Sequence, residues 1–195
     1  MRQISSLVQD PAFFEVLLRY DQDLAAKTRE AGCPCGGPLH QAHYDRKPRG
    51  GPCGGAAGAA TATSRRLSYC CGRDGCRRRR TPPSVRFLGR RVYWSVVVVL
   101  VMALEIWVTE RRYRFIKATL GVGRQTLARW RQWWREAFTK TQFWHLARAA
   151  FMPPVEVTRL PASLVERFCP RADDRDGLIA LLAFLGPLTT LSASG

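Results

Sequence analysis

Two short cysteine motifs constrain the fold of this chain more than any other feature of its sequence. The first reads Cys33-Pro-Cys-Gly-Gly, and the second reads Tyr69-Cys-Cys-Gly-Arg-Asp-Gly-Cys76. A tetrahedral zinc ion needs four ligand atoms at about 2.3 Å, and tight turns that contain glycine can bring pairs of thiolates to that distance. The spacing therefore predicts one structural zinc site, with Cys33, Cys35, Cys71 and Cys76 as its ligands.

Other ligand sets fit the same two motifs. Cys70 could replace Cys71, and His40 or His43 could replace one thiolate, because all of them lie in the same turn-rich segment. Reduced cysteines without a metal are a further alternative, although small turn-rich segments rarely fold without a metal ion or another cross-link. A catalytic zinc ion is not expected, since four thiolates leave no coordination position for water or substrate.

Positive charge is concentrated in the middle of the chain. The formal net charge is +16. Residues 33–91 carry 13 basic and 2 acidic side chains, and residues 92–150 carry 10 basic and 3 acidic side chains. Such a distribution favours a polyanionic partner, above all nucleic acid. The chain has 195 residues, 46% of them hydrophobic, which is enough for one or two small domains with a buried core.

Neither a secretory signal nor a membrane span is expected. The odd number of seven cysteines and the polar N-terminus fit a reducing compartment, so we predict a cytoplasmic, nucleoid-associated protein. The apolar stretch Val92–Val108 is 17 residues long, but Glu105 lies inside it and arginines flank both ends. We therefore interpret it as a buried core helix and not as a transmembrane helix.

The remaining pattern predicts a mainly α protein with a small β element. It divides into an N-terminal helix (residues 1–32), a zinc ribbon with a Gly/Ala-rich loop (33–89), a helix-turn-helix domain (90–145) and a helical tail (146–195). The first helix should start at Asp10 and Pro11 and close at Gly32. Cys53 falls in the Gly/Ala-rich loop and is not expected to be a ligand.

A three-helix DNA-binding unit is predicted from Val92–Val108, Glu110–Thr119 and Arg124–Phe138. Gly121 permits the bend between the last two helices, and Val122 fills the joint. After the bend, apolar side chains recur every three or four residues and predict one buried stripe, made of Leu127, Trp130, Trp133, Trp134, Ala137 and Phe138. The first residues of the last helix would then meet base edges in the major groove.

The predicted nucleic-acid contacts fall into two groups. Those in the zinc ribbon, which would bind phosphates, are Arg77, Arg78, Arg79, Arg80, Arg46, Lys47 and Arg49. Those in the last helix, which would discriminate between sequences, are Arg124, Gln125, Thr126, Arg129 and Arg131. Basic residues of the preceding helix would contact the phosphate backbone on either side; they are Arg111, Arg112, Arg114 and Lys117. For both groups the alternative is an ordinary solvated charged surface.

These motifs resemble the zinc-ribbon and helix-turn-helix proteins that accompany transposases in bacterial insertion sequences. The resemblance covers roughly residues 33–138 and is carried by Cys33–Gly37, Arg46–Gly50, Cys70–Arg79 and Gly121–Trp130. It implies structural zinc and binding to double-stranded DNA, at the ends of an element or at an operator. It also implies a transposase, or a second copy of the chain, as a protein partner.

The chain is not expected to be an enzyme. A two-metal transposase needs three separated acidic residues on a ribonuclease-like sheet, and the sequence has no alternating α/β pattern to form one. It also contains no Gly-Lys-Ser/Thr phosphate-binding loop. The main alternative to DNA binding is an RNA-binding or ribonucleoprotein assembly protein, whose arginines and tryptophans would stack on unpaired bases. An enzyme subunit or a membrane-associated regulator forms a third class.

Overall fold

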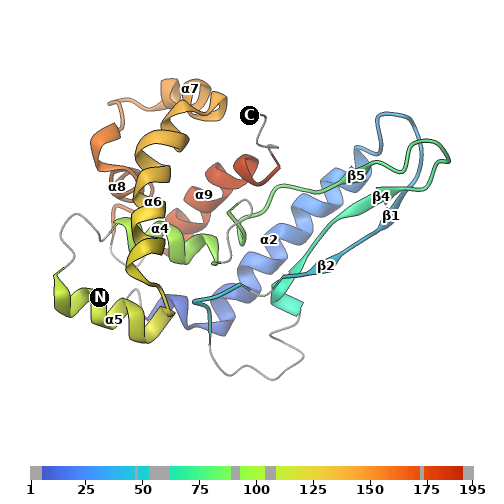
Figure 1. Cartoon of the computed structure of the whole chain (residues 1–195). Helices are drawn as coiled ribbons and strands as arrows, with labels where there is room; N and C mark the ends of the chain where they lie inside the picture. Colours follow the sequence, from blue (N-terminus) through green and yellow to red (C-terminus); the bar gives the residue numbers. More distant parts are fainter. Residues whose placement is uncertain are drawn as a thin grey trace.

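The computed structural model describes residues 6–46, 48–52, 62–88, 93–103, 109–171 and 174–190. Within these ranges the protein is mostly helical and has short antiparallel strands, as predicted. Figure 1 shows a body of helices from which a β-ribbon extends, with the long helix α2 lying beside the ribbon. Cys53 and Lys47 lie outside the described residues.

The helix α2 (Pro11–Glu30) starts and ends at the signals seen in the sequence. Asp10 Oδ1 accepts a hydrogen bond from the backbone N–H of Ala12 at 3.0 Å, and Pro11 occupies the first turn. Gly32 follows the helix with φ of 67°, a left-handed conformation that glycine adopts without strain. The N-terminal half of α2 packs into the helical body, and its C-terminal half packs against the ribbon.

The β-ribbon consists of short antiparallel strands: β1 (Leu39–Gln41), β2 (Tyr44–Asp45), β3 (Arg65–Arg66), β4 (Tyr69–Cys71) and β5 (Arg79–Arg80). β4 lies between β1 and β5, and β2 pairs with β3. The register places Leu39 opposite Cys71 and Tyr69 opposite Arg80. This pairing brings the two cysteine motifs to the same end of the ribbon, where a small core forms from Ala25, Cys33, Leu39, Leu67, Tyr69 and Cys71.

The helix α4 (Ser95–Ala103) lies inside the helical body, and residues 95–102 are all buried. A helix that is apolar on every side needs surrounding helices or lipid, and here helices of the same chain cover it. This confirms a buried helix within the Val92–Val108 stretch; Val92 and residues 104–108 lie outside the described residues. None of the helices in the described ranges has the length and apolar composition needed to cross a bilayer.

A three-residue turn joins α5 (Glu110–Leu120) to α6 (Arg124–Gln132). Gly121 has φ of 65° and donates its N–H to Lys117 O, which ends α5 in the left-handed conformation that glycine favours. Val122 is fully buried, and Tyr93 donates its hydroxyl hydrogen to Gly121 O at 3.2 Å. The turn is therefore held from both sides, by an apolar contact and by a hydrogen bond.

The buried stripe after this turn is narrower than predicted. Leu127, Trp130, Trp134 and Phe138 are buried, but Trp133 is only half-buried and Ala137 is exposed. Each residue of a helix is rotated by about 100° from its neighbour, so the positions just before Trp134 and Phe138 face sideways. The chain continues beyond α6 as a π-helical turn (Trp133–Ala137) and a 3-10 turn (Phe138–Lys140).

The C-terminal helices complete the hydrophobic core. They are α7 (Gln142–Ala147), α8 (Ala162–Phe168) and α9 (Arg175–Leu185), with 3-10 turns at Arg148–Ala150, Val157–Arg159 and Gly186–Thr189. Asp174 caps α9 by accepting the N–H of Gly177 at 2.7 Å. Leucines of α9 and the aromatic rings of Trp144 and Phe151 belong to the same buried core as α4. The tail is thus packed against the earlier helices.

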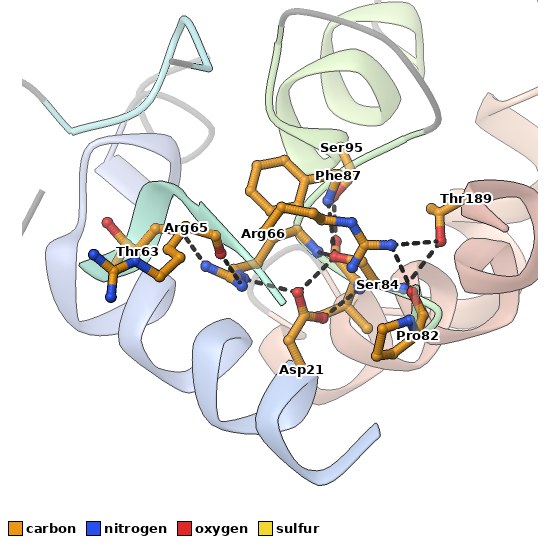
Figure 2. A network of polar contacts seen from close by, with 11 residues as sticks. Asp21, Thr63, Arg65, Arg66, Pro82, Ser84, Phe87, Ser95 and Thr189 are labelled. Carbon is orange, nitrogen blue, oxygen red and sulfur yellow. Dashed lines mark hydrogen bonds and ion pairs between the residues drawn. The ribbon is translucent and has the colours of Figure 1, made fainter. Parts of the chain in front are cut away.

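A buried ion pair joins the β-ribbon to the helical body. The carboxylate of Asp21, on α2, accepts hydrogen bonds from Ser84 Oγ at 2.5 Å, Val85 N at 2.7 Å and Arg86 Nε at 2.8 Å. The side chains of Arg86 and Asp21 are 0% and 1% exposed. Figure 2 shows how this network gathers residues of α2, of the ribbon and of the segment before α4 around one carboxylate.

The far side of the same arginine holds the ribbon. Arg86 donates Nη2 to Arg65 O at 2.9 Å and Nη1 to Thr63 O. Burial lowers the pKa of Arg86, and the charge of Asp21 opposes that shift. The guanidinium therefore stays inside the protein as a cation that is paired with one anion and hydrogen-bonded to two backbone carbonyls.

Candidate metal centre and basic surfaces

Four cysteine sulfur atoms converge at the end of the β-ribbon, and we call this arrangement the four-cysteine site. The Sγ atoms of Cys33 and Cys35 are 3.4 Å apart, those of Cys35 and Cys71 are 3.5 Å apart, and those of Cys33 and Cys76 are 3.7 Å apart. All four ligand atoms lie within 4.8 Å of one another. These cysteines, predicted as ligands from the sequence, could hold a metal ion.

The sulfur spacing fits a metal better than it fits disulfides. A tetrahedral ion with metal–sulfur bonds of about 2.3 Å separates its sulfur ligands by about 3.8 Å, close to the observed distances. A disulfide would need about 2.05 Å, and the four cysteines are free. Four soft thiolate ligands in a tetrahedron suit zinc or iron. Such a site has no open coordination position, so the arrangement is suited to holding structure and not to activating water.

Tight turns place the sulfur atoms. The N–H of Gly36 bonds to Cys33 O at 2.8 Å in the first motif, and the N–H of Cys76 bonds to Arg73 O at 3.1 Å in the second. Gly37 has no room for a side chain, because a Cβ there would lie 2.6 Å from Cys71 Sγ. The glycine residues of the motif therefore allow the backbone to approach the sulfur atoms closely.

The environment of the site already favours one thiolate. A hydrogen bond from the backbone N–H of Gly37, followed by contacts with the other three thiols, lowers the pKa of Cys35 to about 6. The pKa of Cys71 is raised to about 12: the backbone N–H of Arg73 favours its thiolate, but burial and the neighbouring thiols together outweigh that effect. A bound cation would favour the thiolate form of all four ligands.

The alternative ligands lie elsewhere. Cys70 is next to Cys71 in β4, but alternate residues of a strand point to opposite faces, and its thiol contacts Arg77 O at 3.4 Å. His43 Nδ1 contacts the backbone of Ser68 at 3.0 Å. His40 packs beside Gly72, and neither histidine belongs to the group of converging ligand atoms. The structure thus selects Cys71 over Cys70.

The arginine run follows the four-cysteine site into β5. Arg77 pairs with Asp74 at 3.0 Å, and Arg78 is exposed. Arg79 donates to Ala42 O at 3.1 Å. Arg80 is half-buried. We call the three exposed residues of this arginine run, Arg77, Arg78 and Arg79, the ribbon arginines.

The other arm of the ribbon contributes less charge to the surface than expected. Arg46 is half-buried and its guanidinium lies 5.0 Å from the centre of the Phe87 ring, and burial lowers its pKa. Arg49 is exposed and forms a backbone bridge with Tyr93. Lys47 lies outside the described residues. Arg46 therefore packs against the core and does not extend the stripe of ribbon arginines.

A second cationic surface lies on α5 and α6, which we call the α5–α6 surface. Its exposed basic residues are Arg111, Arg112, Arg114, Lys117, Arg124, Arg129 and Arg131. Gln125 is exposed, and Thr126 is half-buried and lies 3.4 Å from Arg129 Nη2. The opposite face of α6 is buried through Leu127 and Trp130. All five α6 residues predicted to contact nucleic acid thus lie on or beside its outer face.

An acidic residue lies within this cationic surface. Glu110 pairs with Arg124 and, at 3.4 Å, with Arg114. The hydrogen bond from Arg124 is the main cause of a lowered pKa for Glu110. Sequence reasoning did not single out Glu110, although an acid in the first turn of a helix is a recognised signal.

The two cationic surfaces lie at different ends of the molecule. In Figure 1 the end of the ribbon, where β4 leads into β5, points away from α5 and α6. Comparison of the chain with protein families, curated proteins and solved structures gives no match. The site's own chemistry is therefore the basis for a functional proposal.

Proposed function

We propose that this protein is a non-enzymatic DNA-binding protein, in which zinc at the four-cysteine site stabilises the ribbon and α6 reads duplex DNA. One observation supports this most strongly: the buried side of α6 leaves Arg124, Gln125 and Arg129 together on its outer face, beside the cations of α5. In helix-turn-helix proteins the first turns of the second helix meet base edges while the first helix crosses the backbone. The α5–α6 turn would serve the same role here.

Zinc supports this function indirectly. The ribbon is short and has a small core, so a bound ion would supply stability that its few apolar contacts cannot. The ion would also hold the backbone from which Arg77, Arg78 and Arg79 extend. Their contacts with phosphates would add affinity without sequence preference. The thiolate set favours zinc over harder ions such as magnesium, which prefer oxygen ligands.

The biological setting we propose is a mobile element or a regulated operator. The resemblance to insertion-sequence accessory proteins supports a transposase or a second copy of the chain as partner, in the bacterial nucleoid. RNA binding remains the second candidate. Trp133 is half-buried and its ring packs against Trp134 and Phe138 at 4.7 and 5.6 Å, so it is less available for stacking on bases than that candidate requires. Trp107 lies outside the described residues.

Arginine variants test the proposal. Fluorescence anisotropy would measure the affinity of the zinc-loaded protein for a duplex selected from a random pool and for the unselected pool. Arg129→Ala should lower the affinity for the selected duplex by about 5- to 100-fold, because a base contact is lost. The affinity for the unselected pool should fall much less. Arg78→Ala should weaken both equally and reduce the salt slope by about one.

Arg171→Ala provides the control for net charge, because Arg171 is exposed but belongs to the C-terminal region. It should have little effect on either duplex. If Arg171→Ala and Arg129→Ala weaken both duplexes to the same extent, binding depends on bulk charge alone and α6 does not read DNA. Tighter binding of single-stranded RNA than of any duplex would favour the second candidate.

A further inference from the structure

Glu110, the first residue of α5, contacts arginines from two helices at once. Its carboxylate accepts a hydrogen bond from Arg114 Nε at 3.4 Å, one turn further along α5, and another from Arg124 Nη2 at the start of α6. The Arg124 guanidinium also lies over the ring of Tyr113, with Cζ 4.1 Å from the ring centre. The first arginine of α6 is therefore held between an anion and an aromatic face.

This arrangement places a carboxylate where a phosphate would be expected. Arginine side chains bind carboxylates and phosphates through the same planar set of N–H donors, so two arginines that converge on one anion could accept either. The side chains of Arg124 and Glu110 are 66% and 54% exposed. An exposed ion pair is held weakly and opens easily, so an incoming phosphate could displace the carboxylate.

We propose that Glu110 is an intramolecular competitor of DNA phosphates: in the free protein it occupies Arg114 and Arg124, and it thereby weakens binding to duplexes of arbitrary sequence. This inference rests on the proposed function, in which the α5–α6 surface meets DNA. After displacement the carboxylate stays close to the bound phosphate and repels it within the Debye length of about 8 Å at physiological salt. Every complex with DNA bears this cost.

The cost is the same at every site, so it lowers both specific and non-specific affinity and leaves their ratio unchanged. Contacts with base edges by Gln125 and Arg129 do not involve the carboxylate, so they can offset the cost at a preferred site. At other sites, where phosphate contacts supply nearly all the affinity, nothing offsets it. Glu110 would therefore leave a preferred site occupied at protein concentrations at which duplexes of arbitrary sequence are no longer bound.

A pair of charge-matched variants tests this. Glu110→Gln removes the competitor, and Glu136→Gln makes the same change in net charge at another exposed acid, whose carboxylate accepts a hydrogen bond from Gln132 at 3.1 Å. Position 136 lies about 18 Å further along the helical segment than Arg124. The probe is a fluorescent DNA duplex of randomised sequence, about 30 base pairs long, titrated at several sodium chloride concentrations.

At physiological salt, Glu110→Gln should bind this duplex about threefold to tenfold more tightly than the wild type, with a salt slope steeper by about one. Glu136→Gln should change the affinity at the same salt concentration by less than about twofold, since about 18 Å exceeds two Debye lengths of about 8 Å. Adding Arg124→Ala to Glu110→Gln should remove most of the gain, because the gain depends on the released arginine.

Equal gains from Glu110→Gln and Glu136→Gln would overturn the inference, since bulk charge would explain both, and would leave the proposed function standing. Unchanged or weaker binding by Glu110→Gln would also overturn it, because Glu110 would then position Arg124 for DNA and not compete with DNA. A wild-type protein that binds no duplex at low salt would refute the proposed function and this inference with it.

Discussion

Replacement of Asp21 by asparagine should destabilise the protein strongly, because it removes the negative charge that pairs with the buried guanidinium of Arg86. The Asp21 carboxylate accepts three hydrogen bonds, at 2.5, 2.7 and 2.8 Å. Asparagine has one acceptor oxygen, and its NH2 group would face N–H and O–H donors of Ser84, Val85 and Arg86. Breaking a buried ion pair by removing one partner costs about 3–5 kcal/mol. A domain is typically stable by only about 5–15 kcal/mol.

An exposed ion pair in the β-ribbon provides the control. Asp45 and Arg65 are 3.3 Å apart, and their side chains are 59% and 50% exposed. Asp45→Asn makes the same chemical change, but exposed pairs contribute about 0–1 kcal/mol. Urea unfolding of the zinc-loaded protein, followed by tryptophan fluorescence, would measure both variants, since Trp94 and Trp134 are buried in the helical body.

The test compares how much free energy of unfolding each variant loses. Asp21→Asn should lose at least about 2 kcal/mol more of this free energy than Asp45→Asn, and the slope of the free energy of unfolding against urea concentration should not change. If the two variants lose the same free energy within about 1 kcal/mol, burial does not amplify this ion pair, and the reasoning from the Asp21 network is wrong.

Three further predictions concern the metal and the DNA. Cys71→Ser should lose the metal ion, while Cys70→Ser should keep one ion per chain. Elemental analysis of protein purified without added zinc would measure the metal content of both variants. Equal metal contents would contradict the assignment of Cys71 as a ligand. Gly37→Ala should lower the metal content, because its Cβ would lie 2.6 Å from Cys71 Sγ, whereas Gly123→Ala, with open space around it, should not; normal loading of Gly37→Ala would contradict this. Arg78→Ala should lower the affinity for a duplex of about 30 base pairs but not for one of about 12 base pairs. An equal loss of affinity for the two duplexes would contradict the proposal of two separate binding surfaces.

Local signals predicted the elements that depend on nearby residues. Asp10 and Pro11 mark the start of α2, Gly121 marks the turn between α5 and α6, and the two cysteine motifs identified four sulfur atoms that the structure brings together. Each signal involves residues within one turn, or a ligand chemistry that permits few arrangements. The choice between Cys71 and Cys70 needed the strand register, because adjacent residues of a strand face opposite ways.

Contacts between distant segments could not be predicted. Asp21 and Arg86 are 65 residues apart, and among many arginines nothing in the sequence indicates that Arg66 and Arg86 are buried. The same holds for Arg46, which belongs to a basic stretch but packs on Phe87. The predicted stripe after Gly121 also included Ala137, since hydrophobic spacing alone does not reveal how wide a face the neighbouring helices cover.

The helix α2 sets the distance between the two cationic surfaces. Near its start, the ring of Phe14 packs on Trp94 at 4.8 Å, next to the tyrosine that holds the α5–α6 turn; eleven residues further along, or about 17 Å, Ala25 packs beside the four-cysteine site. In Figure 1 α5 and the end of the ribbon both extend beyond these two contacts, so joint binding would need a duplex that spans more than about 17 Å.

Joint binding by the two surfaces would require a rigid connection, since a loosely hinged ribbon would hold its arginines at many distances from α6 and lose the advantage of fixed spacing. The buried pair of Asp21 and Arg86 supplies this connection, because it ties α2, the ribbon and the segment before α4 to one another. Loss of the pair would then reduce affinity for long duplexes even at temperatures where the helical body stays folded. The same carboxylate that stabilises the fold would thus also determine how the two surfaces act together on DNA.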